Sequence, residues 1–373
     1  MNILIVPDSF KGTLAASMVC DIIRREFLVR NSGMRCVLLP MSDGGEGFID
    51  TMLRVKVGKY VPELSLDPLN RPVSGGYGVL EEEGEVVIET AVASGLHLLS
   101  HSERNPLYTS SYGTGMLIRK AVEAGYKKFV VGLGGSATND AGAGMLQALG
   151  ARLLDKYGKD IKAGGFYLSE LHTMDMECFN AVVQGLKFKI ACDVRNPLVG
   201  KNGASWVYGP QKGATEEICR LLDRNLSYFA SFVKNITGID IAHTRGGGAA
   251  GGLGAAFKVF FPAKTRAGLE LMSDYTGLEQ KIQAADLVIT GEGKFDFQSL
   301  QGKLASGVLK LAKKYGKRSL LIAGVVDRKA LKKLNIQTDY VSLIDYAGSP
   351  EEAMTNPAYW LSRVMGEWIE KKL

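Results

Sequence analysis

The chain has 373 residues, 46% of them hydrophobic and 23% charged, and a formal net charge of +6. This length exceeds what one ordinary hydrophobic core occupies, so two domains of a globular protein are expected. The sequence contains neither 18 consecutive apolar residues nor a dense Lys/Arg block interleaved with aromatic residues, which excludes a membrane span and argues against a nucleic-acid partner.

The cysteine and histidine positions bear on redox compartment and metal binding. Five cysteines are dispersed without a CxxC pair, and four histidines show no HExxH or comparable spacing. This distribution indicates reduced thiols in a cytoplasmic protein and not a disulfide framework. A histidine-ligated metal is not expected.

The chain begins with two strand–loop–helix units. A strand is expected over residues 2–6, followed by the loop PDSFKG and a helix over about 14–28. A second strand, 36–39, leads into the loop MSDGGEGF and another helix. Ligands of open α/β sheets bind beyond the carboxyl ends of the strands, so both loops are candidate site segments. The pattern of apolar and polar residues changes over residues 60–125. Alternating runs joined by Gly-Glu turns predict antiparallel hairpins there.

A glycine-rich turn dominates the middle of the chain. An apolar strand over 129–133 leads into GGSATNDAGAG, and apolar residues at helical spacing, Met145 to Leu153, follow it. A strand that breaks into glycines before a helix favours an anion at the helix N-terminus. Asn139 or Asp140 could cap that helix. The other interpretation is that the glycines only permit a tight turn and close packing.

The rest of the middle region is less regular. A polar loop is expected over about 155–185. A strand over 188–191 then runs into the long segment CDVRNPLVGKNGASWVYGPQKGAT, whose length suggests function. An amphipathic helix is expected over about 216–232. The segment RGGGAAGGLGAAF after it could bind a ligand or simply pack closely.

In the C-terminal ninety residues, predicted strands and helices alternate again. Strands are expected over 286–290, 319–323 and 339–343, with the loop GEGKFDFQSLQGK after the first and a final helix over 359–370. A Rossmann/flavodoxin-like parallel-sheet domain built from both chain ends, 1–62 and 282–373, is therefore predicted. A mixed α/β domain, 63–281, is inserted, and the active site is expected in the cleft between the two.

Five glycine-containing loops carry the groups that phosphoryl transfer to a small hydroxy acid requires. This reaction needs hydrogen-bond donors or cations to bind phosphate, carboxylates to bind Mg²⁺, a base to accept the hydroxyl proton and a cation to bind the substrate carboxylate. A single loop aspartate is more often only a cap or turn residue, so the argument rests on several at strand ends. No GxxxxGK[ST] motif occurs, which excludes a P-loop enzyme.

Two alternatives remain open from the residues alone. Gly132 to Ala137 fits G-x-G-x-x-A, and Asp155 lies near where a ribose-binding acid of an NAD-linked oxidoreductase would stand. The polar residues Thr138 to Asp140 argue against this reading, and Asp155 also suits a turn. A non-catalytic binding protein for small acids would explain the anion loops but not the surplus of acidic groups.

Taken together, the motifs resemble the bacterial type I glycerate kinases. PDSFKGTLAA, SDGGEGF, IETAVASGL, YGTG, GLGGSATNDAGAGMLQALGA, ACDVRNPLVGKNGAS, GPQKGA, GGGAAGGLGAA and TGEGKFDFQSLQGK occur in the family's order across nearly the whole chain. The resemblance implies a two-domain α/β enzyme that phosphorylates D-glycerate with ATP, with 2-phosphoglycerate favoured as the product. Lys294-Phe295 and Phe297 depart mildly from the family pattern but leave Asp296 and Gln298 in place.

The residue roles that we predict rest on the motif positions. Asp193 is predicted to take the hydroxyl proton, and Lys11 or Arg195 to hold the transferring phosphate or the substrate carboxylate. The remaining candidates are Ser9, Gly44, Gly45 and Asn196 for substrate, Gly134, Gly135, Ser136, Asn139, Asp140, Gly291 and Gly293 for nucleotide phosphate, and Asp8, Asp43, Glu46, Glu292 and Asp296 for Mg²⁺. The expected partners are D-glycerate and ATP, without nucleic acid or membrane, and a homodimer is compatible with the sequence.

Overall fold

The computed structural model describes residues 1–30, 32–301 and 303–373. Gly302 of the segment GEGKFDFQSLQGK therefore lies outside the described residues. The chain divides into two compact units, the first comprising Met1–Asp43, Arg54–Lys56 and Ala267–Leu373 and the second Gly44–Leu53 and Val57–Arg266. The first unit is thus built from both ends of the chain, and the second is inserted within it.

These limits differ from the predicted division into 1–62 with 282–373 and 63–281. Strand β3 (Gly58–Leu66) pairs along its whole length with β4 (Pro72–Leu80), which joins it to the second unit. Helices α10 (Gly268–Thr276) and α11 (Leu278–Ala284) belong to the first unit. Both differences come from packing partners that the local pattern does not reveal.

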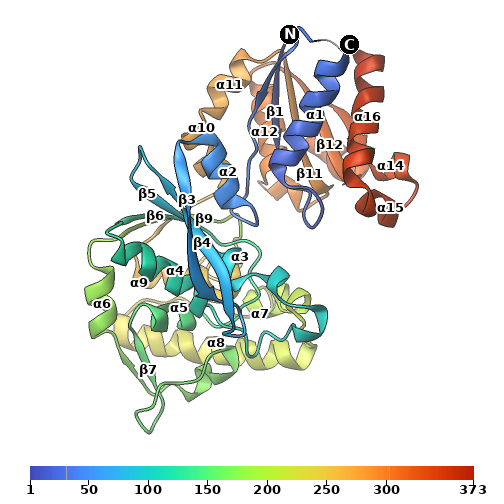
Figure 1. Ribbon diagram of the computed structural model, residues 1–373. Helices are drawn as coiled ribbons and strands as arrows, with labels where there is room; N and C mark the ends of the chain where they lie inside the picture. The colour runs from blue at the N-terminus through green and yellow to red at the C-terminus, as the bar shows by residue number, and fades with distance from the viewer. Residues whose placement is uncertain (31, 302) are drawn as a thin grey trace. The chain divides into compact units, whose positions relative to one another are not determined.

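A five-stranded parallel sheet forms the first unit, in the order β13-β12-β11-β1-β2 (Figure 1). The chain places β2 on one side of β1 and returns to β11 on the other, which is the flavodoxin-like strand order. The expected fold class is therefore confirmed. The strands are β1 (Asn2–Pro7), β2 (Arg35–Leu38), β11 (Leu287–Phe295), β12 (Arg318–Val326) and β13 (Asp339–Ser342); the further helices are α1 (Ala16–Arg30), α12 (Leu304–Lys314), α13 (Arg328–Leu334), α14 (Ile344–Ala347), α15 (Pro350–Thr355) and α16 (Pro357–Lys372).

Helices cover both faces of this sheet. Successive side chains of a strand point to opposite faces, so Ile5, Ile289 and Ile322 pack with α1 and α16 in one buried cluster. Leu321 and Phe295 pack with α12 and α13 in another. Burial on both sides explains why these strands read as continuous apolar runs.

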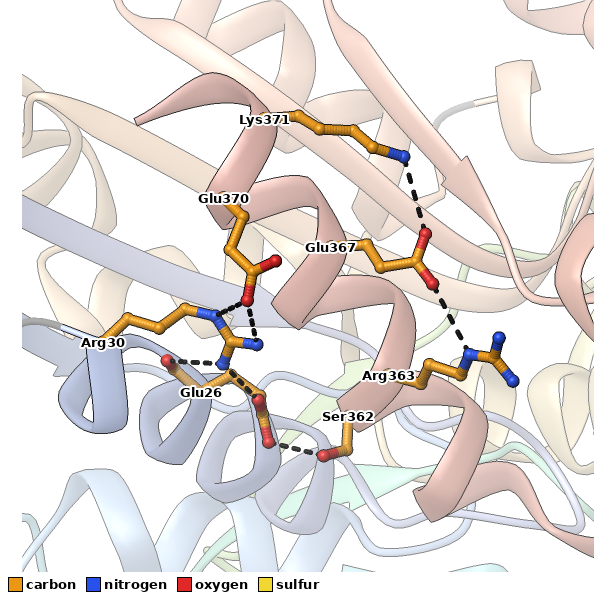
Figure 2. A network of polar contacts seen from close by, with 7 residues as sticks. All are labelled: Glu26, Arg30, Ser362, Arg363, Glu367, Glu370 and Lys371. Atoms are coloured by element: carbon orange, nitrogen blue, oxygen red, sulfur yellow. Dashed lines mark hydrogen bonds and ion pairs between the residues drawn. The ribbon is translucent and has the colours of Figure 1, made fainter.

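Helices α1 and α16 lie side by side and bring the two ends of the chain together (Figure 1). Figure 2 shows Arg30 of α1 between Glu26, 2.8 Å away, and Glu370 of α16, 2.9 Å away, while Ser362 donates to Glu26. Ion pairs at the surface contribute about 0–1 kcal/mol each. The apolar contacts between the two helices therefore dominate this junction.

A six-stranded mixed sheet forms the second unit, in the order β10-β9-β6-β5-β4-β3. Strands β3, β4 and β5 are antiparallel, which confirms the predicted hairpins as far as Glu89. The rest of the range 60–125 contains helices α3 (Thr90–Ser94) and α4 (Tyr112–Glu123), so hairpins were wrongly expected there. The parallel strands β5 (Glu85–Glu89), β6 (Lys128–Gly132), β9 (Lys187–Ala191) and β10 (Lys264–Arg266) end in register, with Glu89, Gly132, Ala191 and Arg266 side by side. The loops that follow these strands consequently leave from one edge of the sheet.

Helices pack against this second sheet, and short elements occupy the segment predicted as a polar loop. A two-stranded ribbon, a 3-10 helix and α6 lie in or beside residues 155–185, so that expectation was wrong. The elements are α2 (Phe48–Val55), α3 (Thr90–Ser94), α4 (Tyr112–Glu123), α5 (Ala143–Ala148), β7 (Arg152–Leu154), β8 (Thr173–Asp175), α6 (Glu177–Val183), α7 (Ala204–Tyr208), α8 (Glu216–Thr237) and α9 (Leu253–Phe260), with 3-10 helices at Leu96–Leu98, His101–Glu103, Gly165–Glu170, Pro210–Lys212 and Ala249–Gly252.

Two predicted element lengths need correction. Helix α5 ends at Ala148, because Gly150 adopts a φ of +105° and Leu153 lies in strand β7. Strand β11 continues to Phe295, because Glu292 and Lys294 pair with β12. The first half of GEGKFDFQSLQGK is therefore strand and not loop.

Two further expectations concern cysteines and membrane spans. All five cysteines are free thiols, as their dispersed positions predicted. Across residues 1–30, 32–301 and 303–373, no helix combines the length and the apolar character that crossing a bilayer requires.

Candidate active site

Acidic side chains lie close together in the first unit, between β1 and β11. Here the strand order changes direction, because β2 lies on one side of β1 and β11 on the other. Asp8 follows β1, and its main-chain N–H donates to Gly291 O of the neighbouring β11 over 2.8 Å. Glu292 lies on β11 next to Gly291, and both acidic residues are buried. Lys11 Nζ lies 3.1 Å from Asp43 Oδ2. The switch point between β1 and β11 is where ligands of such sheets bind.

The charges of this cluster are poorly compensated. Burial raises the pKa of Asp8 well above its usual range; the neighbouring Asp43 raises it further, and Lys11 opposes both effects. Burial also raises the pKa of Glu292 to about 7. The Oε1 atom of Glu292 has no hydrogen-bond partner among the described residues. Carboxylates held in this way favour a bound cation, which would stabilise their ionised forms.

The remaining predicted residues of this unit have local partners. Ser9 donates its main-chain N–H to Asp8 Oδ1 over 2.7 Å. Asp296 closes a turn, since its Oδ1 accepts from Gln298 N at 2.8 Å. A Cβ added at Gly291 would lie 2.2 Å from Ile322 O, so close strand packing accounts for this glycine. Gly291 and Gly293 both lie within strand β11, and their role as phosphate ligands stays a prediction.

In the second unit, three glycines bring two loops into contact at the edge where the parallel strands end. Gly134 N donates to Gly44 O over 2.8 Å. A Cβ added at Gly134 would lie 2.4 Å from Gly45 Cα, and one at Gly44 would lie 2.8 Å from Ala191 O. The loops Gly44–Gly47 and Gly134–Asp140 therefore meet beside the end of β9.

Glu89 supports the first of these loops and was not predicted. Its carboxylate accepts from Gly47 N at 3.0 Å and from Ile49 N at 3.2 Å, at the start of α2. Burial raises the pKa of Glu89 to about 7 in spite of these hydrogen bonds. Glu46 itself is exposed. Glu89 ends a buried strand, and only the pairing of β5 in the sheet places it beneath the loop.

Replacing Glu89 with alanine should lower the free energy of unfolding by about 2 kcal/mol at pH 5, because two amides at the start of α2 lose their acceptor. The pKa of about 7 exceeds the ordinary 4.5, so the contribution of this carboxyl falls as pH rises between those values. The loss should therefore be smaller at pH 8. Urea unfolding at both pH values measures it, with the exposed Glu82→Ala as control; equal losses would contradict this account.

The glycine-rich loop contains an internal hub at Asp140. Its carboxylate accepts from Ser111 N and Ser111 Oγ, both at 2.8 Å, and from Gly142 N and Gly144 N at 3.1 and 3.3 Å. The N-cap residue of α5 is Gly142, so Asp140 accepts from amides at the start of this helix without being its N-cap residue. At the N-terminus of α5, where an anion was predicted, the amides of Gly142 and Gly144 donate to the Asp140 carboxylate. The role of Asp140 as a phosphate ligand stays a prediction.

The other side of the same loop is polar and buried. Asn139 Nδ2 donates to Ser205 Oγ over 3.1 Å. Lys212 Nζ donates to Ser136 Oγ at 3.2 Å and to Thr138 O at 2.7 Å. The sequence segment GPQKGA gave no sign that its lysine is buried, because a lysine followed by glycine normally reads as an exposed turn. Only the tertiary contacts bring Lys212 to this loop.

The predicted catalytic segment begins just beyond β9. Asp193 lies two residues after Ala191. The exposed guanidinium of Arg195 makes no ion pair with any described residue, and its main-chain O accepts from Gly246 N at 3.2 Å. Asn196 is held by the Tyr208 hydroxyl at 2.8 Å and by Asn202 O at 2.9 Å. Arg195 is therefore available to an anion, whereas Asn196 already has internal partners.

The second glycine-rich segment packs against the first. A Cβ added at Gly251 would lie 1.9 Å from Thr138 O, and one at Gly252 would lie 2.5 Å from Ala141 Cα. Ala141 N also donates to Gly251 O over 3.0 Å. Of the two interpretations of RGGGAAGGLGAAF, close packing is the one that these contacts support.

Asp155, the acid required by the dinucleotide-binding alternative, closes an exposed turn. Its Oδ1 accepts from Tyr157 N at 2.8 Å and from Lys159 N at 3.0 Å. The residue that would bind ribose is thus explained as a turn residue.

Known proteins match this chain over almost its full length. The family model described as "Glycerate kinase family" matches residues 3–371. The chain belongs to the glycerate kinase family. The glycerate kinase of Bacillus subtilis (strain 168) is 40% identical over 97% of this chain and 95% of its own length. The glycerate 2-kinase of Escherichia coli (strain K12) is 43% identical over 87% and 85%, respectively.

A solved structure agrees with the fold. A crystal structure assigned to glycerate kinase 2 of Salmonella typhimurium LT2 covers 100% of this chain and 99% of its own, with 38% identity and a TM-score of 0.79. The resemblance inferred from the motifs is confirmed, and so is the expectation of a kinase. Neither the oxidoreductase nor the non-catalytic binding protein is supported by these comparisons.

Proposed function

We propose that this glycerate kinase family member transfers the γ-phosphoryl group of ATP to D-glycerate and forms 2-phosphoglycerate. The observation that carries the proposal is the pair of buried carboxylates, Asp8 and Glu292, at the switch point between β1 and β11. The names of the relatives support glycerate as the acceptor. The Escherichia coli relative, named a glycerate 2-kinase, supports the 2-hydroxyl as the site of transfer.

We propose Mg²⁺ as the metal of this reaction. Mg²⁺ in phosphoryl-transfer sites is held by one or two carboxylates together with substrate phosphates and waters. Among the described residues no three possible ligands converge on one point, which suits such a partial protein site. Asp8 and Glu292 fit this donor set because both are buried and Glu292 Oε1 lacks a protein partner. When bound, the metal would neutralise charge on the phosphates.

The chain's own residues would then perform three tasks. Asp193 would accept the hydroxyl proton of glycerate, since a carboxylate within hydrogen-bond reach of the nucleophile serves as a general base in kinases. Arg195, with its free guanidinium, would bind a carboxylate or phosphate by paired hydrogen bonds. Lys11 would supply a positive charge near Asp8 and Asp43; Asp43 raises the pKa of Lys11, so its ammonium stays protonated.

We propose the cellular setting and the assembly of this protein from its sequence. Dispersed free thiols are typical of cytoplasmic proteins, and we place the activity there. The proposed partners are small molecules, and a homodimer is the assembly to be tested by light scattering.

The direct test incubates the purified protein with Mg-ATP and D-glycerate and follows ADP. We expect ADP only when glycerate is present, and phosphorus NMR should show coupling to the proton on carbon 2. Coupling to the two protons of carbon 3 would overturn the position of transfer. ADP formation that does not depend on glycerate would overturn the proposed acceptor.

A further inference from the structure

A buried ammonium group lies against the glycine-rich loop of the second unit. Lys212 ends the 3-10 helix Pro210–Lys212, and only 3% of it is exposed. Its two hydrogen-bond acceptors, Ser136 Oγ and Thr138 O, are both neutral. No carboxylate of the described residues lies within ion-pair distance of its Nζ atom. A positive charge is therefore buried without a direct counter-charge.

Burying this charge costs free energy unless a binding partner compensates it. An ammonium group transferred from water to a protein interior without a partner loses several kcal/mol of solvation. Burial accordingly lowers the pKa of Lys212 to about 7, and Asp140 in the adjoining loop opposes this shift. Arg104 packs against the neighbouring Gly213, where an added Cβ would lie 2.1 Å from Arg104 O and 3.0 Å from Arg104 Cβ. A bound anion would restore the ordinary pKa of Lys212.

The surroundings of Lys212 offer further donors. An ammonium carries three N–H bonds, and two of them have the acceptors named above. The main-chain N–H groups of Gly135, Ser136, Thr138 and Asn139 also have no hydrogen-bond acceptor within the described residues. Gly135 adopts a φ of +75°, a conformation that successive amides use to form anion-binding concavities. Cationic and amide donors together match an oxyanion.

We propose that Lys212, with Ser136 and the amides of residues 135–139, binds an oxyanion of one substrate. The group is either the carboxylate of glycerate or a phosphate of ATP. This inference rests on the proposed function and adds a substrate-binding residue to it. It also replaces the N-terminus of α5, which Asp140 occupies, as the anion site of the glycine-rich loop.

The test compares binding of each substrate alone by titration calorimetry at pH 6.5. Lys212→Met removes the charge and keeps the length of the side chain, Lys212→Arg keeps the charge, and Lys234→Met removes an exposed lysine that pairs with Asp240. We expect Lys212→Met to raise Kd at least tenfold for either D-glycerate or ATP and to leave the other within twofold. The weakened ligand identifies the oxyanion. Lys212→Arg should lose less affinity than Lys212→Met, and Lys234→Met should match wild type.

A folded Lys212→Met protein with both Kd values within twofold of wild type would overturn the inference. Should that variant fail to fold, wild-type binding at pH 8 in two buffers of different ionisation enthalpy decides the question. A bound oxyanion should draw close to one proton onto Lys212, and no proton uptake with either ligand would refute the proposal. Turnover by the wild-type protein separates failure of this inference from failure of the proposed function. If the wild type is active and the variants are unaffected, only the role of Lys212 is rejected. If the wild type neither binds nor phosphorylates glycerate, the proposed function is rejected as well.

Discussion

Replacing Asp193 with asparagine should lower kcat by about 10²- to 10⁴-fold, the range that a general base contributes. The KM for glycerate should stay within about threefold, because asparagine keeps the shape and most hydrogen bonds of aspartate. Asp193 follows β9 by two residues, at the edge where Gly44, Gly45 and Gly134 pack together. Steady-state kinetics at saturating Mg-ATP measure both constants.

The matched control for this variant is Asp160→Asn. Asp160 belongs to the same unit but forms an exposed ion pair with Arg152 at 3.0 Å, so its replacement should leave kcat unchanged. A near-normal kcat for Asp193→Asn would show that another group takes the proton. A large rise in the KM for glycerate with little change in kcat would make Asp193 a binding residue instead.

Replacing Glu292 with glutamine should change activity and stability in opposite directions. Activity should fall about 10²-fold or more, since a preorganised charge at the proposed metal site is lost. Stability of the metal-free protein at pH 8 should rise by about 3 kcal/mol, because the ionised carboxylate is buried there without a cation. Glutamine has the same size and no charge, so packing on β11 is retained.

The pH dependence gives the sign of this second prediction. The pKa of Glu292, about 7, is above the ordinary value of 4.5. The wild-type carboxyl therefore stabilises the fold at low pH, and this contribution is lost as pH rises from about 4.5 to 7. Unfolding with EDTA present should show the gain of Glu292→Gln at pH 8 and little gain at pH 5. Glu367→Gln, on the surface of α16, is the control (Figure 2). A destabilised Glu292→Gln at pH 8 would rule out the uncompensated charge.

The sequence by itself determined the fold class and the segments that carry the candidate site. Continuous apolar runs marked the parallel strands, because both of their faces are buried. Polar loops follow these runs at the ends of strands. Asp8 follows β1 of the first sheet, and Asp193 follows β9 of the second. Within each sheet, the parallel strands end on the same edge. The order of the motifs was specific enough to indicate the family before any contact was known.

Only the tertiary structure decided which polar residues are free to act. Asp140 and Asp155 both looked like loop acids, yet one is a buried hub and the other closes an exposed turn. Glu89 and Lys212 were overlooked because their burial depends on segments far away in the chain. Desolvation is set by which segments pack together, and a local pattern contains no record of it. The pKa shifts that mark Glu292 and Lys212 as functional candidates therefore arise only in the folded protein.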